Sequence, residues 1–233
     1  MLLEPHPQLC VQRLSVGEEG APVVVIDQLV REPERLLRKA GRLRFTPQGA
    51  MFPGVRARAP LSYEVFVEGV LRPLLDEVFG LPRDARLAFP MCHYSLVTQA
   101  PERLAFLQRI PHIDSTTALG LATVHYLFRA AWGGTAFYRH RGTGYETVDE
   151  ARRDGYYAAL EHEAKGEHAP ATGYIDGDTE LFERIASIDG VFNRMIVYRR
   201  NALHSGNIDS RRVPPADLQA GRLSINSFID VKP

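Results

Sequence analysis

Three residues of the 233-residue sequence have the types and the spacing to bind one metal ion. The motif PHID contains His112 and Asp114, and side chains two positions apart on an extended chain point to the same side. A second histidine, His204 in NALHSGN, follows the β-type run MIVYRR and supplies a third donor. Two imidazoles and one carboxylate leave adjacent positions of an octahedral ion open, an arrangement that suits Fe(II) with O₂ and a chelating cosubstrate.

Each of these motifs has a commoner role when it is taken alone. His-x-Asp occurs by chance in about one chain in three of this length. A single histidine is more often a hydrogen-bonded loop or core residue than a metal ligand. A metal site is favoured by the order of the motifs along the chain, together with the residues that come after His204.

A candidate anion site lies C-terminal to the second histidine. Arg222 and Ser224 in GRLSINSFIDV lie on an expected strand and face the same side of it. An arginine inside a barrel needs an anionic partner, because an unpaired buried charge is costly, and its planar fork binds a carboxylate bidentately. Alone, Arg222 would be interpreted as a surface residue or half of a structural ion pair. Arg211 and Arg212 are weaker candidates for the same role.

The first 85 residues are predicted to supply one strand and supporting helices. The predicted elements there are irregular residues 1–22, a strand at 23–27, a helix at 33–41, a loop at 45–60 and a helix at 62–80 that Ser62 caps and Pro73 kinks.

From about residue 86 the sequence is typical of short antiparallel strands, rich in Val, Ile, Tyr and Phe and separated by turn residues. Strands are expected within 86–97, 119–130, 134–141, 192–200 and 221–231. A capping box, Thr147-x-x-Glu150, opens a helix, and apolar spacing predicts a shorter helix over 181–188. The long segment between His204 and Arg222 is predicted to be a loop between paired strands.

These elements predict one domain of the α+β class. The segregation of helices and strands indicates an antiparallel barrel or sandwich at 86–231 with N-terminal helices packed on its outside. A helical insertion at about 147–188 would be a lid or a subunit contact, which leaves a homodimer open.

Composition excludes several classes of protein. The 28 basic and 28 acidic residues give a formal net charge of 0, so no long-range field attracts nucleic acid or anionic lipid. No apolar run reaches the roughly 18–20 residues of a membrane span, and the N-terminus lacks the pattern of a signal peptide. Two cysteines are too few for a disulfide framework. We therefore expect a cytoplasmic protein without nucleic-acid or membrane partners.

In this order the motifs resemble those of the Fe(II)/2-oxoglutarate-dependent dioxygenases, in the branch similar to prolyl 4-hydroxylases and within a bacterial subfamily of it. The resemblance covers roughly residues 86–231, from PHID through LATVHYLF, WGGTAFYRH and LHSGN to GRLSINSFI. It implies a double-stranded β-helix (jelly-roll) core. It also implies Fe(II), 2-oxoglutarate and O₂ as cofactor and cosubstrates, with release of succinate and CO₂.

The resemblance assigns roles to residues of this sequence. His112, Asp114 and His204 would be the iron ligands, and Arg222, helped by Ser224, would hold the distal carboxylate of 2-oxoglutarate. Family members that halogenate carry a small residue in place of this carboxylate, so a carboxylate at position 114 implies hydroxylation.

Further contacts are expected from residues beside these motifs. Tyr94 and Tyr126, on the strands before and after PHID, are candidates to hydrogen-bond the cosubstrate, although a strand tyrosine is more often a core residue. Gln108 and Arg109, just before PHID, are candidates for substrate contact.

The substrate is expected to be a small molecule or an amino-acid or peptidyl side chain. Two alternatives stay open. One is a non-catalytic, cupin-like jelly-roll module that binds a small acidic ligand or a metal. The other is a cupin-type enzyme that needs no cosubstrate, which the Arg222-x-Ser224 pair argues against.

Overall fold

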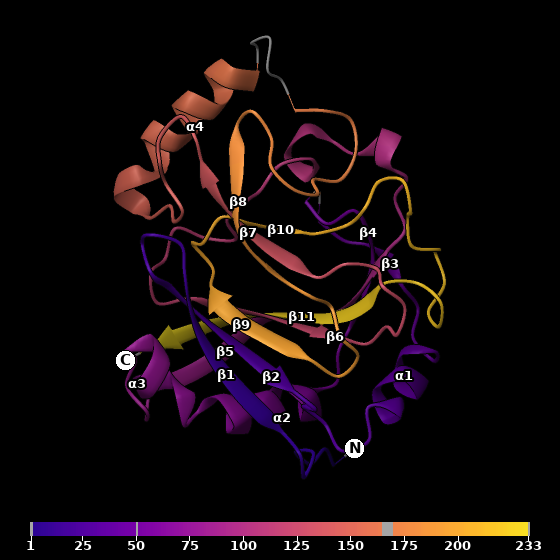
Figure 1. The fold of residues 1–233 in the computed structure, drawn as a ribbon. Coiled ribbons are helices and arrows are strands. Elements are labelled where there is room, and N and C mark those ends of the chain that lie inside the picture. The colour runs from indigo at the N-terminus through magenta and orange to yellow at the C-terminus, as the bar shows by residue number, and fades with distance from the viewer. Residues whose placement is uncertain (1, 50, 165–169, 233) are drawn as a thin grey trace.

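Two antiparallel sheets and four α-helices make up the computed structural model, which describes residues 2–49, 51–164 and 170–232 (Figure 1). In spatial order, the larger sheet consists of β1 (Cys10–Val16), β2 (Ala21–Asp27), β9 (Met195–Arg199), β6 (Leu121–Tyr126), β11 (Leu223–Lys232), β5 (Arg86–Val97), β4 (Gly54–Arg58) and β3 (Thr46–Pro47). The smaller sheet consists of β10 (His204–Gly206), β7 (Thr135–His140) and β8 (Phe182–Ile188).

Helices cover the outer faces of both sheets (Figure 1). The helices are α1 (Glu34–Ala40), α2 (Leu61–Leu71), α3 (Leu74–Phe79) and α4 (Glu150–Ala164), with short 3₁₀ turns at Pro101–Arg103 and Phe106–Gln108. The first three pack on the large sheet through one buried apolar cluster, and α4 packs on the small sheet through another.

Side-chain alternation along β11 separates the helix-facing layer from the layer between the sheets. Leu223 and Ile225 join the core under α1–α3. Arg222, Asn226 and Phe228 face the other way and line a cavity. Burial of the intervening apolar layer, which includes residues of β2, β6, β7 and β9, drives the two sheets together. The strands thereby bring distant segments to one cavity.

The predicted α+β class is confirmed. Each of the five expected strand segments after residue 86 contains a strand, and α1 lies within the helix expected at 33–41. The helix expected at 62–80 is divided into α2 and α3 at Pro73, because proline cannot donate the backbone hydrogen bond that a continuous helix needs there.

The N-terminal 85 residues contain more strands than predicted. Residues expected to be irregular or loop form the edge strands β1 and β3 and the strand β4 beside β3, all in the large sheet. The expected cap at Ser62 is also wrong: α2 begins at Leu61 after Pro60, without a side-chain cap.

The predicted helical insertion at 147–188 is helical in the described residues only over α4; residues 165–169 lie outside the described ranges. Residues 182–188, expected to be a helix, form β8, which pairs with β7. The capping box is also absent, since Thr147 bonds the carboxylate of Glu19 instead. The loop after β10 does not join paired strands, because β10 and β11 belong to different sheets.

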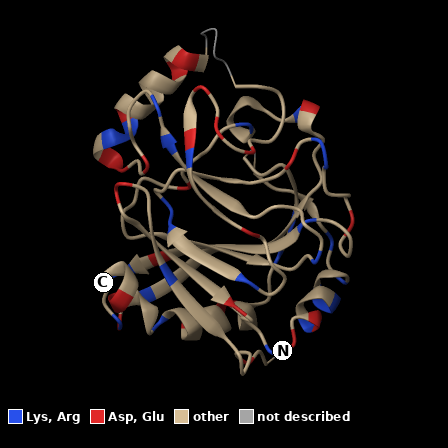
Figure 2. Ribbon diagram, in the orientation of Figure 1, with Lys and Arg blue, Asp and Glu red and all other residues tan. Residues whose placement is uncertain are grey.

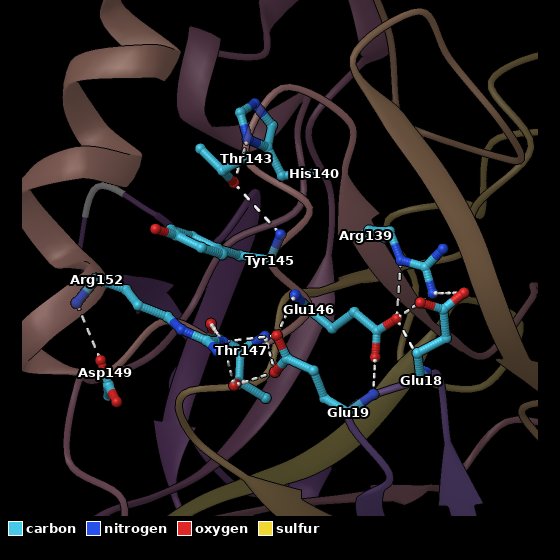
Figure 3. Close-up of polar contacts among 10 residues, drawn as sticks. All are labelled: Glu18, Glu19, Arg139, His140, Thr143, Tyr145, Glu146, Thr147, Asp149 and Arg152. Atoms are coloured by element: carbon cyan, nitrogen blue, oxygen red, sulfur yellow. Dashed lines mark hydrogen bonds and ion pairs between the residues drawn. The ribbon is translucent and has the colours of Figure 1, made fainter.

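A polar clasp ties the β1–β2 turn to the segment before α4 (Figure 3). The buried Glu146 carboxylate accepts hydrogen bonds from the backbone N–H groups of Glu18 and Glu19 and from the Arg139 guanidinium. In return, the Glu19 carboxylate accepts from the backbone of Glu146 and Thr147. These reciprocal bonds compensate the buried charge, which identifies the cluster as structural.

Acidic and basic residues are interspersed along the exterior helices α1 and α4 (Figure 2). Within the described ranges, no helix combines the length and the apolar character that crossing a bilayer requires.

Candidate active site

Three side chains that the sequence predicted as metal ligands meet between the two sheets. Nε2 of His112 lies 3.6 Å from Oδ1 of Asp114, and Nε2 of His204 lies 3.6 Å from Oδ2 of the same carboxylate. One donor atom from each residue lies within 4.8 Å of the other two. Residues from two distant segments therefore form one potential ligand set.

Backbone hydrogen bonds hold the two segments together. His112 and His204 exchange N–H···O bonds of 2.9 and 3.0 Å, and the Asp114 N–H donates to the carbonyl of Arg200 at 2.8 Å. These bonds attach the PHID segment to the chain that runs from the end of β9 into β10. Since β10 also pairs with β7, His204 is fixed in the small sheet.

The ionisation of the triad suits a cation. Burial lowers the pKa of His204 to about 4, so its imidazole is neutral near pH 7. Burial by itself raises the pKa of Asp114, but the adjacent His204 and His112 outweigh it and the net pKa lies below the ordinary value. The site thus presents a carboxylate and neutral imidazole, the forms that bind metal.

The tautomer of His204 is also set by a backbone contact. Nδ1 lies 2.9 Å from the carbonyl oxygen of Ala202, an acceptor, so Nδ1 carries the proton and Nε2 keeps its lone pair. Backbone carbonyls orient metal-binding histidines in this way. The donor types, their spacing and this tautomer fit a divalent transition metal.

The triad opens into a cavity of about 260 Å³, close to the lower end of small-molecule sites at roughly 300 Å³. The large sheet contributes apolar walls through Met91, Val124 and Phe228, and the small sheet contributes Thr135 and residues of β10. A mostly apolar cavity with a few polar groups is typical of sites that bind and orient small ligands.

Arg222 lines this cavity without a carboxylate partner among the described residues. Its side chain is buried, and its Nε and one terminal nitrogen donate to the carbonyls of Trp132 and Gly134 at 3.2 and 2.6 Å. Burial lowers the pKa of Arg222 while Tyr126 and Tyr174 raise it. A guanidinium held by neutral carbonyls keeps its charge uncompensated, which favours an anionic ligand.

The other predicted cosubstrate residues have different positions. Ser224 is buried two residues beyond Arg222, and its hydroxyl donates to Oδ1 of Asn226 at 2.7 Å. Tyr126 is buried under the Arg222 guanidinium, 5.9 Å from ring centroid to Cζ, and its hydroxyl bonds Thr135 at 2.8 Å. Both therefore support residues that line the cavity.

Tyr94 is not at the cavity, contrary to the prediction. Its hydroxyl donates to the carbonyl of Leu36 in α1 at 3.0 Å, and its ring is buried in the helix-side core. The cause is the parity of β5: Tyr94 pairs with Ile225, which faces the helices, whereas Met91 and Val97 face the cavity.

The remaining candidates divide in the same way. Gln108 lines the cavity, whereas Arg109 turns back to the carbonyl of Leu104 and borders a different surface pocket. Arg211 pairs with Asp209 at the surface, and Arg212 lies over the Trp132 ring, so neither substitutes for Arg222.

Sequence reasoning missed Arg56. It lies on β4, in a segment expected to be loop, and its side chain reaches the same cavity. Its Nε is buried without a hydrogen-bond partner among the described residues, and its guanidinium packs 4.3 Å from the centroid of the Phe52 ring. Burial lowers the pKa of Arg56, and the charge of Asp114 partly reverses that effect. The alternating pattern VRAR was the only available signal for this strand.

A family model spans almost the whole described chain, matching residues 7–229. The chain belongs to the family described as "Family of unknown function (DUF6445)". A comparison with curated proteins gives no match.

The chain is similar to solved structures at low sequence identity. HygX from Streptomyces hygroscopicus, with nickel and 2-oxoglutarate bound, has a TM-score of 0.52 and 12% identity, covering 93% of this chain and 83% of HygX. The α-ketoglutarate-dependent epimerase SnoN from nogalamycin biosynthesis has a TM-score of 0.48 and 13% identity, covering 91% and 81%. At this identity the likeness to HygX shows the fold alone.

Proposed function

We propose that this protein is an Fe(II)- and 2-oxoglutarate-dependent oxygenase with a jelly-roll core, of the prolyl 4-hydroxylase-like type. The observation that carries the proposal is that the His112, Asp114 and His204 side chains and the uncompensated guanidinium of Arg222 line one cavity. A metal site alone would fit a cupin-like binding module. The buried Arg222 guanidinium beside the metal site would bind the carboxylate of a cosubstrate.

His112, Asp114 and His204 would hold the metal. Backbone pairing places the three donors together: His112 is bonded to His204 at the start of β10, and Asp114 is bonded to Arg200 just after β9. The Ala202 carbonyl keeps Nε2 of His204 free to bind. Two imidazoles and one carboxylate leave positions of the ion open for a chelating cosubstrate and O₂.

Arg222 would bind the distal carboxylate of 2-oxoglutarate. Its contacts with the Trp132 and Gly134 carbonyls fix the guanidinium plane, and its remaining N–H groups are available for the carboxylate. Thr135, whose hydroxyl is bonded to Tyr126, lines the same part of the cavity as a second polar contact. Positioning the cosubstrate in this way orders it before substrate is oxidised.

When bound, iron and 2-oxoglutarate would supply the oxidising chemistry, with oxidative decarboxylation to succinate and CO₂. One atom of O₂ would enter succinate and the other the substrate, so that a C–H group would become C–OH. Met91, Val124 and Phe228 exclude water from the reacting volume. The carboxylate of Asp114 occupies the position where halogenating members of the resembled family have a small residue, which favours hydroxylation as the outcome. HygX, a protein of the same fold, has nickel and 2-oxoglutarate bound, which supports the choice of cosubstrate.

The proposal is tested by adding Fe(II) and 2-oxoglutarate without oxygen and recording the weak visible charge-transfer band of the chelate. We expect the band with the wild-type protein and its loss in His112→Ala. Equal spectra for the two proteins would contradict the metal assignment. A band without succinate formation, after O₂ and a pool of substrates are added, would instead favour the cupin-like binding module.

A further inference from the structure

Arg56 gives the cavity a second guanidinium, separate from the one proposed to bind the cosubstrate. Arg56 pairs with Ser95 across β4 and β5, and β5 lies between β4 and β11. The backbone of Arg56 on β4 and the backbone of β11 are therefore two strand spacings apart, roughly 10 Å. The two guanidinium groups enter the cavity from different strands.

The charge of Arg56 stays uncompensated when the proposed ligands are bound. Asp114 is the one carboxylate among the described residues that line the cavity. The charges of a ferrous ion, the Asp114 carboxylate, doubly ionised 2-oxoglutarate and the Arg222 guanidinium sum to zero. Arg56 then adds one positive charge in a half-buried position, and no residue in the described part of the chain bonds its Nε. Such a group favours an anionic ligand.

The surroundings of Arg56 define what else the ligand contains. Phe52, Met91 and Phe228 present apolar surface to the cavity, and the Phe52 ring holds the guanidinium from one side. Apart from Asp114, the described residues that line the cavity include no carboxylate that could pair with an ammonium group of a ligand. A ligand with a carboxylate at one end and an apolar body, without a free ammonium group, matches these walls.

We propose that Arg56 binds the carboxylate of the primary substrate, and that this substrate is a small, mainly apolar carboxylic acid. The inference rests on the proposed oxygenase function and narrows its substrate class. Arg56 is then a specificity-determining residue, since it fixes one end of the substrate and leaves the apolar part to reach the metal. The reaction converts one C–H group of this acid to C–OH, with 2-oxoglutarate and O₂ as co-reactants.

Binding of matched acids and amides tests the inference. Calorimetry would use protein loaded with Ni(II) and saturating 2-oxoglutarate, titrated with hexanoate and hexanamide, and with phenylacetate and phenylacetamide. Saturating 2-oxoglutarate keeps Arg222 occupied. Because a charge-assisted bidentate contact is lost in the amide, we expect each acid to bind about 10- to 100-fold more tightly than its amide. An equal affinity for acid and amide, or no binding of either, would overturn the inference.

Two variants assign the effect to one arginine. In Arg56→Gln, the preference for the acid should disappear while 2-oxoglutarate affinity stays within about twofold of wild type. Arg58→Gln is the matched control: it is on the same strand, is about half exposed and pairs with Glu64 of α2 at 2.6 Å. This control should keep the acid preference, and its loss there would contradict a specific role for Arg56.

The same titrations separate this inference from the proposed function. If wild type binds neither Ni(II) nor 2-oxoglutarate, the oxygenase proposal fails and the substrate inference fails with it. If wild type binds both but shows no acid preference, only the substrate inference fails. If Arg56→Gln abolishes 2-oxoglutarate binding and Arg222→Gln does not, Arg56 is the cosubstrate residue, and the inference is wrong while the enzyme class stands.

Discussion

The backbones of His112 and His204 are paired to each other by two hydrogen bonds, each residue donating its N–H to the carbonyl of the other. The two rings lie with their centroids 4.5 Å apart. This isolated bridge fixes the spacing of two proposed ligands that are far apart in sequence. Because their positions come from backbone pairing, side-chain substitutions in the triad should remove metal binding without unfolding the site.

We expect His112→Ala and Asp114→Asn each to lower Fe(II) or Ni(II) affinity by at least about 100-fold. His112→Ala removes one of three donors, and Asp114→Asn replaces a carboxylate with a neutral amide oxygen, which is a weaker ligand. Calorimetric titration with Ni(II), with circular dichroism to confirm folding, measures the effect.

His162→Ala is the control for this experiment. His162 lies exposed on α4, away from the cavity, and its variant should bind metal as wild type does. Full metal affinity in both triad variants would contradict the assignment of the site.

Arg222 provides the second prediction. Arg222→Lys keeps the positive charge but loses the planar fork, so 2-oxoglutarate affinity of the metal-loaded protein should fall by about 10-fold or more. Arg222→Gln should lower it further, while metal affinity alone stays near wild type. Arg211→Gln, which changes a surface arginine paired with Asp209, should leave both affinities unchanged. Loss of metal affinity in Arg222→Lys would indicate a structural role instead.

The clasp around Glu146 predicts a stability effect separate from the cavity. Glu146→Gln keeps the shape of the side chain but removes its negative charge. That charge pairs with the Arg139 guanidinium and accepts hydrogen bonds from two backbone N–H groups. We expect the free energy of unfolding to fall by about 1–3 kcal/mol. Urea denaturation measures it, and Glu150→Gln, at the exposed start of α4, should cost far less.

Gly17 offers an independent check on the same clasp. Its φ is +71°, and a Cβ there would lie 2.0 Å from a carboxylate oxygen of Glu146. Gly17→Ala should therefore also destabilise the protein. Glu146→Ala removes the clashing atoms, so Gly17→Ala should cost less in that variant than in wild type. An equal cost in both backgrounds would show that the contact between these residues is not the cause.

The triad and Arg222 were predictable because short motifs in a fixed order carry them. The convergence of His112 and Asp114 follows from the two-residue period of an extended chain. Arg56 was not predictable in the same way. Its strand is short, lies near the sheet edge and follows a segment rich in proline and glycine, so composition favoured a loop.

The error at β8 has a specific cause. Leu181, Phe182, Ile185 and Ile188 have the spacing of an amphipathic helix. In the structure the pairing with β7 shifts register between Phe137 and Tyr138, which leaves Ile185 as an extra residue. This bulge interrupts the two-residue alternation of the strand, and the resulting spacing of apolar residues is that of a helix.

The prediction that Tyr94 contacts the cosubstrate was wrong because a single sequence does not tell which face of β5 meets the helices.

His125 is the buried histidine on the opposite face of β6 from the cavity. Its Nδ1 lies 3.1 Å from the Tyr63 hydroxyl and its Nε2 lies 3.2 Å from Oδ1 of Asn193. Burial lowers the pKa of His125 from 6.5 to about 4, and the bond to Asn193 reverses only part of this effect. The neutral ring therefore joins α2 to the large sheet.

The last prediction is a pH dependence of stability that His125 causes. Between pH 6.5 and pH 4 the unfolded chain binds a proton at this residue and the folded chain does not, so stability falls as pH decreases through this range. From pH 7 to pH 5 the contribution is about 2 kcal/mol. In His125→Gln, the decrease in unfolding free energy over these pH values should be smaller by that amount, whereas His162→Gln should match wild type. An unchanged pH profile in His125→Gln would show that His125 is not held neutral by the fold.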